Sequence, residues 1–270
     1  MVIPFLLAAL GPLMAQSTCP VAGQPAGAPC YTAASISNSA SNQAGPYSTN
    51  SFLTIYGINL SNVTQAIRPS DIGAGELPWE LTGTDVNVLI GGISAYIYYV
   101  SPGQANVLIP SLLTPGPVTV ELENRSLYGP AVEITLAAAA PTLFQSDATT
   151  VIATHGNGPL VTTDSPAAPG EIVVLYATGL GVTAPSAICG WIPEMAAPLA
   201  DLIDFEVLLN GTAVDPQLIL YAGQTPGFAG LFQINLQLPA DSPQNPEIRI
   251  GFVNNLGSSL SPAQRFLPVE

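Results

Sequence analysis

The single histidine and the acidic residues are the side chains of this 270-residue sequence that could do chemistry. His155 falls in a hairpin predicted over residues 151–161, with its turn at Asn157 and Gly158. A Ser-His-Asp triad through His155 needs serine and aspartate partners that the sequence does not place, so we interpret His155 as structural or exposed. Because the sequence has no lysine and one histidine, Schiff bases, P-loop phosphate handling and zinc sites built on several histidines are excluded.

Carboxylates leave one catalytic possibility open. Asp201, Asp204 and Glu206 cluster near the start of a predicted strand, and Glu194 lies in the loop before it. A glycosidase needs only two acids about 5 to 10 Å apart, and hard oxygen ligands could form a weak Ca²⁺ site, although EF-hand spacing is absent. We favour a third interpretation, in which these charges flank the strand and add solubility. We therefore predict no enzyme activity, no catalytic or metal-binding residues and no cofactor.

The charge balance limits the partners. Four arginines, no lysine and 18 carboxylates give a formal net charge of −14. Such a field repels phosphate backbones and anionic headgroups, which argues against nucleic acid and against electrostatic membrane binding. The remaining partners are sugars, cations, other proteins and copies of the chain itself.

A sequence motif that occurs twice, which we call the duplicated phrase, predicts the elements that would position these side chains. Residues 99–110 read Tyr-Val-Ser-Pro-Gly-Gln-Ala-Asn-Val-Leu-Ile-Pro, and residues 221–239 end on the same Gln-x-Asn-apolar-x-apolar-Pro pattern. A duplicated phrase indicates a duplicated structural unit.

Short alternating segments predict the class of both units. Residues 52–56 and 172–176 are rich in β-branched and aromatic residues, and Gly-Gly at 91–92 and Asn-Gly at 210–211 are hairpin signals. With 27 prolines and 25 glycines between such segments, the sequence predicts an all-β protein of two tandem sandwiches. The expected boundaries are residues 16–50 for an N-terminal arm with a first edge strand, 51–140 for the first sandwich and 141–270 for the second.

Trp79 and Trp191 are the only tryptophans, and each lies in the long irregular loop of one unit, residues 61–83 and 182–202. Long loops on a rigid scaffold often carry binding sites, so these two residues are the candidate ligand contacts. The alternative is that each tryptophan caps its own core.

The N-terminus predicts export. Residues 2–13 are apolar and are followed by a small-residue site before Gln16, which is typical of a signal peptide over residues 1–15 and too short for a membrane span. A buried N-terminal strand is the alternative. Cys19 and Cys30 flank a Pro, Gly and Ala-rich stretch that a disulfide would fix, which leaves Cys189 as a buried apolar residue.

Residues 170–181, 220–223 and 230–235, together with residues 99–106 of the first unit, resemble a family of secreted bacterial proteins, the Solibacter-type uncharacterised C-terminal domain abundant in Acidobacteria. The resemblance covers about residues 31–270. Such units also resemble the immunoglobulin-like IPT/TIG modules of bacterial surface proteins. The resemblance implies this fold and an extracellular setting, and it carries no established activity.

These observations lead to one favoured hypothesis and two alternatives. We favour a secreted or cell-surface, non-enzymatic module that binds a protein or polysaccharide, or itself, through the loops of Trp79 and Trp191. The first alternative is a subunit of a self-assembling extracellular filament, with the arm at 16–50 as a donor strand. The second is a carbohydrate-binding or carbohydrate-active protein, in which a tryptophan stacks on a sugar ring.

Overall fold

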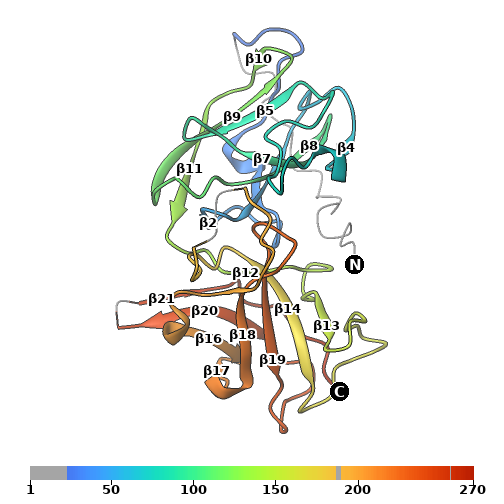
Figure 1. The fold of residues 1–270 in the computed structure, drawn as a ribbon, viewed down its shortest axis with the longest axis vertical. Coiled ribbons are helices and arrows are strands. Elements are labelled where there is room, and N and C mark those ends of the chain that lie inside the picture. The colour runs from blue at the N-terminus through green and yellow to red at the C-terminus, as the bar shows by residue number, and fades with distance from the viewer. Residues whose placement is uncertain (1–22, 187–189, 256) are drawn as a thin grey trace. The chain divides into compact units, whose positions relative to one another are not determined.

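The computed structural model describes residues 23–186, 190–255 and 257–270. Contacts divide the chain into two compact units: unit 1 consists of Met1–Ala138 and Ile188–Ile192, and unit 2 consists of Ala139–Ala187 and Pro193–Glu270. Each unit contains two β-sheets, so the predicted all-β sandwich class is confirmed (Figure 1). The predicted signal peptide lies outside the described residues. Within those residues, none of the helices has the length and apolarity needed to span a bilayer.

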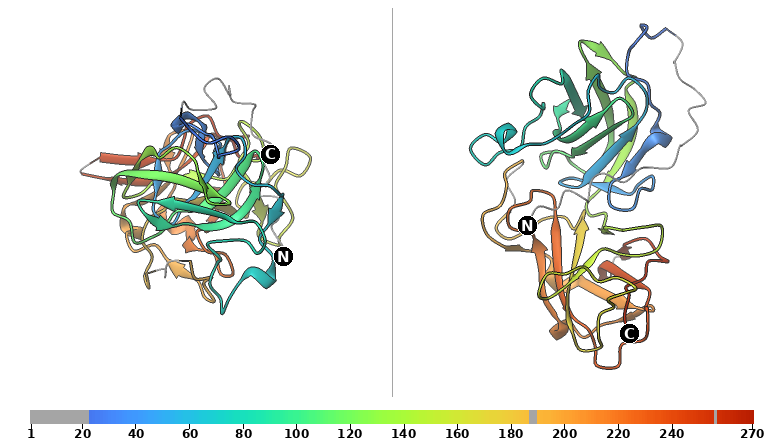
Figure 2. Two further views of the ribbon diagram at one scale, coloured as in Figure 1. Left: turned by 90° about the horizontal axis from the view of Figure 1, so that it is seen from above. Right: turned by 90° about the vertical axis from the view of Figure 1, so that its right-hand side faces the viewer.

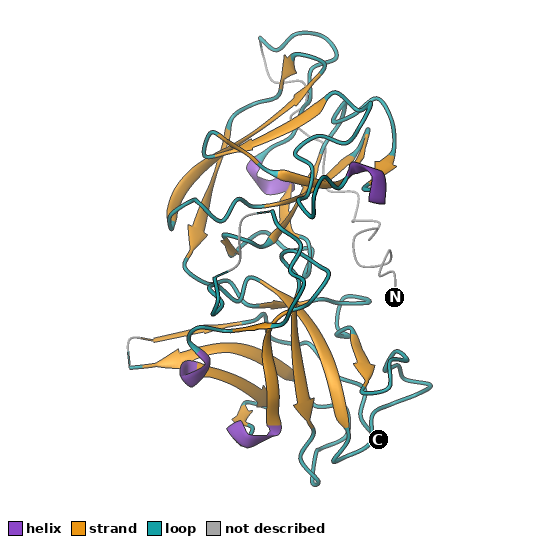
Figure 3. Ribbon diagram, viewed as in Figure 1, coloured by secondary structure: helices purple, strands orange, loops and turns teal. Residues whose placement is uncertain are grey.

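Unit 1 has one sheet with the strand order β1-β3-β8-β7-β4 and a second with the order β2-β11-β9-β5-β6, in which β10 also pairs with β9. Two 3-10 turns, η1 and η2, interrupt the strands (Figure 3). The bounds are η1 Ala33–Ser35, β1 Ile36–Asn38, β2 Tyr47–Ser48, β3 Phe52–Tyr56, β4 Gln65–Ala66, η2 Pro69–Asp71, β5 Val86–Ile90, β6 Ile93–Ser94, β7 Tyr96–Ser101, β8 Gln104–Leu108, β9 Gly116–Asn124, β10 Leu127–Tyr128 and β11 Val132–Ala137.

Unit 2 has one sheet with the strand order β12-β14-β19-β18-β15, in which β13 also pairs with β14, and a second with the order β17-β16-β20-β21 (Figure 1, Figure 2). The bounds are β12 Thr142–Leu143, β13 Ala153–His155, β14 Ile172–Thr178, β15 Ala197–Pro198, η3 Leu202–Asp204, β16 Phe205–Leu209, β17 Thr212–Ala213, η4 Pro216–Leu218, β18 Ile219–Gln224, β19 Phe232–Gln237, β20 Ile248–Asn254 and β21 Gly257–Leu260.

Each unit has its own core, built from the buried face of alternating strands. In β5 and β16 every second residue is buried and the residues between are half-buried, which is the period-2 pattern of a half-buried strand. The buried residues of these two strands are Val86, Val88 and Ile90 in unit 1 and Phe205, Val207 and Leu209 in unit 2.

The duplicated phrase forms the same element in both units. In unit 1 it is the hairpin β7–β8, whose strand β8 also pairs with β3; in unit 2 it is β18–β19, whose strand β19 also pairs with β14. Both hairpins have a register shift at the same place, just before the tyrosine that pairs with the asparagine of the phrase, Tyr99 with Asn106 and Tyr221 with Asn235.

The glutamine and asparagine of the phrase also make the same side-chain hydrogen bond. Gln104 Nε2 donates to Asn106 Oδ1 at 2.8 Å, and Gln233 Nε2 donates to Asn235 Oδ1 at 3.2 Å. Equal pairing, equal register shift and equal side-chain bonding follow from one sequence pattern, so the repeat in the sequence is a repeat in the structure.

Two of the predicted hairpin turns form as tight two-residue turns. Gly91 and Gly92 join β5 to β6 with φ of 58° and 77°, and Asn210 and Gly211 join β16 to β17 with φ of 50° and 79°. Positive φ at both central residues defines the type I′ turn, which matches the twist of the flanking strands.

Within the segment predicted as an N-terminal arm with a first edge strand, residues 23–50 are described, and they supply β1 and β2 to the sheets of unit 1. β1 pairs with β3, and β2 pairs with β11 in parallel. Tyr31, Ile36 and Tyr47 lie in the core of unit 1. The Tyr47 hydroxyl donates to the Ile36 carbonyl at 2.7 Å, and the Tyr31 hydroxyl accepts from the Leu122 N–H at 2.7 Å. Both buried hydroxyls are therefore satisfied within the sandwich.

Replacing Ile97, a fully buried core residue of β7, tests the core of unit 1. We expect Ile97→Ala to reduce the free energy of unfolding by about 2 to 5 kcal/mol, because it removes buried methyl groups and leaves a cavity. Denaturant unfolding followed by tryptophan fluorescence measures this, since both tryptophans belong to unit 1. Leu112→Ala is the control, because Leu112 is 74% exposed. Equal unfolding midpoints for the two variants would contradict the assignment of Ile97 to the core.

Candidate binding surface

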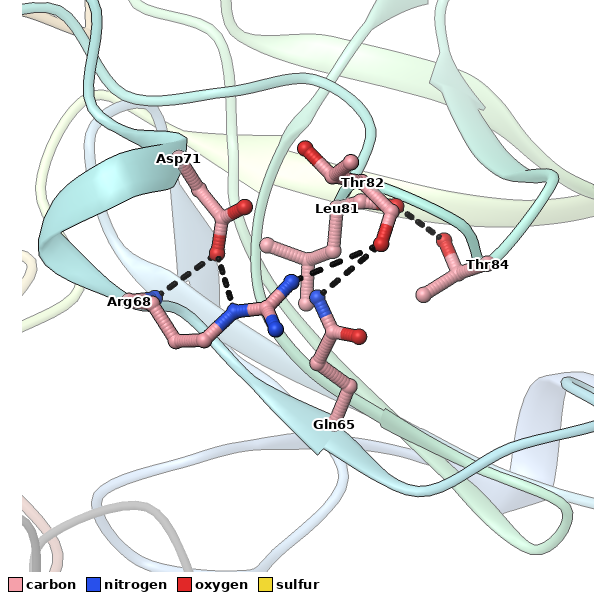
Figure 4. A network of polar contacts seen from close by, with 6 residues as sticks. All are labelled: Gln65, Arg68, Asp71, Leu81, Thr82 and Thr84. Carbon is pink, nitrogen blue, oxygen red and sulfur yellow. Dashed lines mark hydrogen bonds and ion pairs between the residues drawn. The ribbon is translucent and has the colours of Figure 1, made fainter.

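A polar network closes the base of the long loop between β3 and β5 in unit 1. The Arg68 guanidinium and the Gln65 side-chain amide both donate to the Thr82 carbonyl, at 3.5 and 3.4 Å, and Arg68 Nε lies 3.3 Å from Asp71 Oδ2 (Figure 4). The Thr84 hydroxyl donates to the Leu81 carbonyl at 2.8 Å. Leu81 is fully buried beneath this network. The two ends of the loop are thus held together.

Asp71 is the charged centre of this network. Burial raises the pKa of its carboxyl, but hydrogen bonds from the Arg68 N–H and guanidinium, with further help from Thr82, outweigh burial and hold the pKa below its usual value. Asp71 is therefore ionised over the whole neutral range, and its contact with Arg68 persists there.

The middle of the loop turns back on itself and pairs with a distant segment. Gly73 and Glu76 exchange two backbone hydrogen bonds, 3.2 and 2.9 Å long, around a turn in which Ala74 and Gly75 have positive φ. The chain then runs beside residues 190–192: the Leu77 N–H donates to the Gly190 carbonyl and the Ile192 N–H donates to the Gly75 carbonyl, both at 2.8 Å.

This pairing places both tryptophan-bearing segments in unit 1. Trp191 lies opposite Glu76 in the ladder, and its ring covers Gly75, because a Cβ built on Gly75 would lie 3.8 Å from two of its ring atoms. Trp79 follows Pro78, whose carbonyl accepts from the Ile97 N–H of β7 at 2.8 Å. We call residues 73–79 and 190–192 the tryptophan surface.

The two indole rings of the tryptophan surface remain largely accessible. Trp79 is 57% exposed and Trp191 is 43% exposed. Backbone hydrogen bonds fix the segments that carry them, so the rings are presented on an ordered support. An exposed aromatic ring on such a support offers a flat apolar face to a ligand.

Tyr96 of β7 contacts Glu76 and Gly190 of the tryptophan surface. The Tyr96 hydroxyl donates to Glu76 Oε1 at 3.5 Å, and the Tyr96 ring packs against Gly190 so closely that a Cβ there would overlap it. Gly190 has φ of +71°, a backbone conformation that side chains disfavour. The sequence pattern points to the tryptophans but not to Glu76, Tyr96 or Gly190, because nothing local in the sequence links positions about a hundred residues apart.

The four carboxylates considered for catalysis lie along residues 194–206 of unit 2. Glu194 is exposed in the loop before β15, Asp201 precedes η3, Asp204 ends η3 and Glu206 lies in β16. The Asp204 carboxylate accepts from the Asn254 side chain at 3.0 Å. Among the described residues, no group of three or more His, Cys, Asp or Glu side chains gathers as a metal site would require.

His155 has the partners that the sequence analysis did not place. Its Nδ1 lies 2.5 Å from Glu171 Oε1, and its Nε2 lies 3.2 Å from the Ser165 carbonyl and 3.3 Å from the Ser165 hydroxyl. These contacts join β13 to the segment at residues 165–171 through the His155 ring.

Of the two cysteines in the predicted disulfide, the structure describes Cys30. Cys30 is buried, pairs through its backbone with Ile58 and is not a free thiol. Cys19 and Cys189 both lie outside the described residues. The bond between Cys19 and Cys30 therefore stays a prediction.

Gly190→Ala tests whether the tight packing of residue 190 positions Trp191. We expect the added methyl group to push residues 190–192 away from Tyr96, which breaks their pairing with residues 75–77 and raises the acrylamide quenching of tryptophan fluorescence. Gly211→Ala is the matched control, because Gly211 has φ of +79° but no atom within 4 Å of its Cβ position. Equal quenching in the two variants would show that the pairing does not depend on Gly190.

The lowered pKa of Glu171 predicts a pH dependence of stability. Burial raises the pKa of Glu171. Hydrogen bonds from the Ala168 N–H and from His155 lower this pKa by more than burial raises it, so it lies below its usual value. A lowered carboxyl pKa gives stability that is present above the unfolded-state pKa of about 4.3 and is lost as the pH falls through the folded-state pKa. Denaturant unfolding between pH 3 and 6 should show a steeper loss for the wild type than for Glu171→Gln. Parallel curves would contradict this assignment.

Residues 35–146 match the family model described as IPT/TIG domain. A search of curated proteins gives no match. The resemblance to the Solibacter-type family stays a prediction, because the matching model is the IPT/TIG domain.

Solved structures similar to this chain include two surface glycan-binding proteins and a tandem immunoglobulin protein. The SGBP-B of the Bacteroides ovatus mixed-linkage glucan utilization locus, in complex with a mixed-linkage heptasaccharide, is 12% identical with a TM-score of 0.33, over 83% of this chain and 43% of that chain. The SGBP-B of a Bacteroides uniformis xyloglucan utilization locus is 11% identical with a TM-score of 0.25, over 89% and 49%. Titin Ig tandem domains are 9% identical with a TM-score of 0.25, over 83% and 90%.

The chain thus spans less than half the length of either SGBP-B chain, and likeness of this size says nothing about its ligand. The family model, in contrast, covers most of unit 1, from η1 to the strand that opens unit 2. This chain is thus an all-β protein of immunoglobulin-like sandwiches, and its residues 35–146 are similar to the IPT/TIG domain.

Proposed function

We propose that the chain is a secreted or cell-surface, non-enzymatic binding module whose ligand contacts the tryptophan surface. The observation that carries the proposal is the backbone pairing of residues 75–77 with residues 190–192, which holds two exposed indole rings on hydrogen-bonded segments of one unit. The extracellular setting is supported by the apolar run before Gln16 and by the low content of charged residues.

The exposure of the rings supports binding over core capping. A tryptophan that caps a core buries most of its area, whereas Trp79 leaves more than half of its surface in water. Aromatic residues in ordered, accessible positions are the side chains that most often dominate binding energies. A protein or a polysaccharide at the cell surface fits such a site.

A carbohydrate is the ligand class that a specific observation favours. Glu76 pairs with Trp191 through the backbone bridge, and its carboxylate accepts a hydrogen bond from Tyr96. A flat apolar ring next to a carboxylate acceptor matches a sugar, which has an apolar ring face and hydroxyl groups at its edge. A neutral sugar also suits a chain with a net charge of −14, because an uncharged ligand is not repelled by it.

The self-assembly alternative is less well supported. It needs the arm at residues 16–50 as a donor strand for a neighbouring copy. The part of that arm which the structure describes pairs with β3 and β11 of its own unit, and Ile36 and Tyr47 lie in the core.

Pull-down of the protein on insoluble polysaccharides and on protein arrays tests the proposal. We expect Trp79→Ala and Trp191→Ala each to weaken binding by about 2 kcal/mol or more, roughly thirtyfold in Kd, as for other central aromatic contacts. Tyr128→Ala is the control, because Tyr128 is a half-exposed aromatic residue of unit 1 outside the tryptophan surface. Equal retention of all four proteins would reject the tryptophan surface. Loss on protein targets but not on polysaccharides would reject only the carbohydrate.

A further inference from the structure

Unit 2 has an apolar hollow at its surface. It is lined by Leu202, Ile203, Phe205, Pro216 and Ile219, which come from η3, β16, η4 and β18. Phe205 is buried and its ring packs edge to face against Phe252, with the ring centroids 5.7 Å apart. The hollow therefore has a fixed aromatic wall.

The side chains around the hollow are unusually exposed for their type. Ile203 is 95% exposed and Leu202 is 46% exposed. Neither contributes to the core of unit 2, so nothing in the fold of the unit requires an aliphatic residue at either position. Contiguous exposed apolar side chains with polar neighbours are typical of an interaction site.

Charge identifies the kind of partner. Asp201 and Asp204 flank the two η3 residues of the hollow, and Asp215 directly precedes Pro216. Asp215 caps η4 by accepting from the Gln217 N–H at 2.9 Å, which fixes that carboxylate next to the hollow. Residues 201–220 contain four acidic residues and no lysine or arginine. The two chain segments that supply the hollow's residues thus carry negative charge and no positive charge.

A second copy of this chain is a poor occupant. It carries the same net charge of −14 and has no lysine. All four arginines are already engaged with carboxylates or backbone carbonyls of their own chain: Arg68 with Asp71, Arg125 with Asp85, Arg249 with Ser261, and Arg265 with Ala263 and Gln264.

We propose that this hollow docks one large apolar side chain of a different protein, on a segment whose neighbouring residues are lysine or arginine. The apolar side chain fills the space between η3 and η4 against Phe205, and the basic neighbours lie beside Asp201 and Asp215. Apolar burial gives the contact its stability, and the charges give its selectivity and its salt dependence.

Fluorescence anisotropy with three labelled peptides tests the proposal. The probe is acetyl-Lys-Lys-Phe-Lys-Lys-amide, and the comparison peptides replace Phe by Ala or every Lys by Glu. We expect the probe to bind at least about tenfold more tightly than either comparison peptide, because each lacks one of the two required features. Binding of the Ala peptide as tight as that of the probe would show only general attraction to an acidic protein and would overturn the proposal.

Variants of the chain locate the contact. Ile203→Ser should weaken the probe about tenfold without affecting the fold, since Ile203 is exposed. Asp201→Asn with Asp215→Asn should weaken it and flatten its salt dependence, while asparagine keeps the capping geometry. Leu220→Ser is the control, because Leu220 is half-exposed in unit 2 but does not line the hollow. Unchanged probe binding to Ile203→Ser would overturn the proposal, as would a concentration-dependent dimer in light scattering that Ile203→Ser abolishes.

Discussion

The pairing of a central hairpin with the first long strand is the constraint on which each unit depends. In unit 1 the hairpin β7–β8 is joined through β8 to β3, and in unit 2 the hairpin β18–β19 is joined through β19 to β14. A slip of one residue would turn every buried side chain of these strands to the opposite face. The register shift at the same point of both hairpins and the Gln-to-Asn bond fix the pairing, so the sequence pattern recurs where the register must be the same.

The tryptophan surface is a consequence of that pairing. The long loop of unit 1 is attached to β7 through the β4 pairing and through the bond from the Ile97 N–H to the Pro78 carbonyl. The Arg68 network closes the loop at its base. Because β7 is held in register by β8, the loop, the 73–76 turn and the segment at 190–192 inherit their positions from the hairpin. A surface in a long loop can be ordered in this way with only a two-residue strand and a 3-10 turn of its own.

Local signals predicted the elements of this protein, and long-range signals were absent. The Gly-Gly and Asn-Gly turns, the alternation in β5 and β16 and the repeated phrase are all patterns within a few residues, and the structure has each of them. The core role of Tyr31 and Tyr47 was not predictable, because a Ser, Asn and Ala-rich segment lacks the alternation of a strand. The pairing of residues 75–77 with 190–192 and the contact of His155 with Glu171 depend on the folded chain, and no spacing rule relates such positions.

The low charge of the surface makes the exposed tryptophans unfavourable for the free protein. Charged residues form 8% of the chain, against about 25% in ordinary soluble domains, so solubility rests on hydroxyl, amide and backbone groups. On such a surface an exposed indole increases the risk of unspecific association more than on a highly charged one. Trp79 and Trp191 nevertheless stay accessible, and the residues that support Trp191 include a glycine, Gly190, whose conformation and packing exclude a side chain. A surface that is both unfavourable to expose and carefully supported is better explained by a ligand that covers it than by the needs of the core.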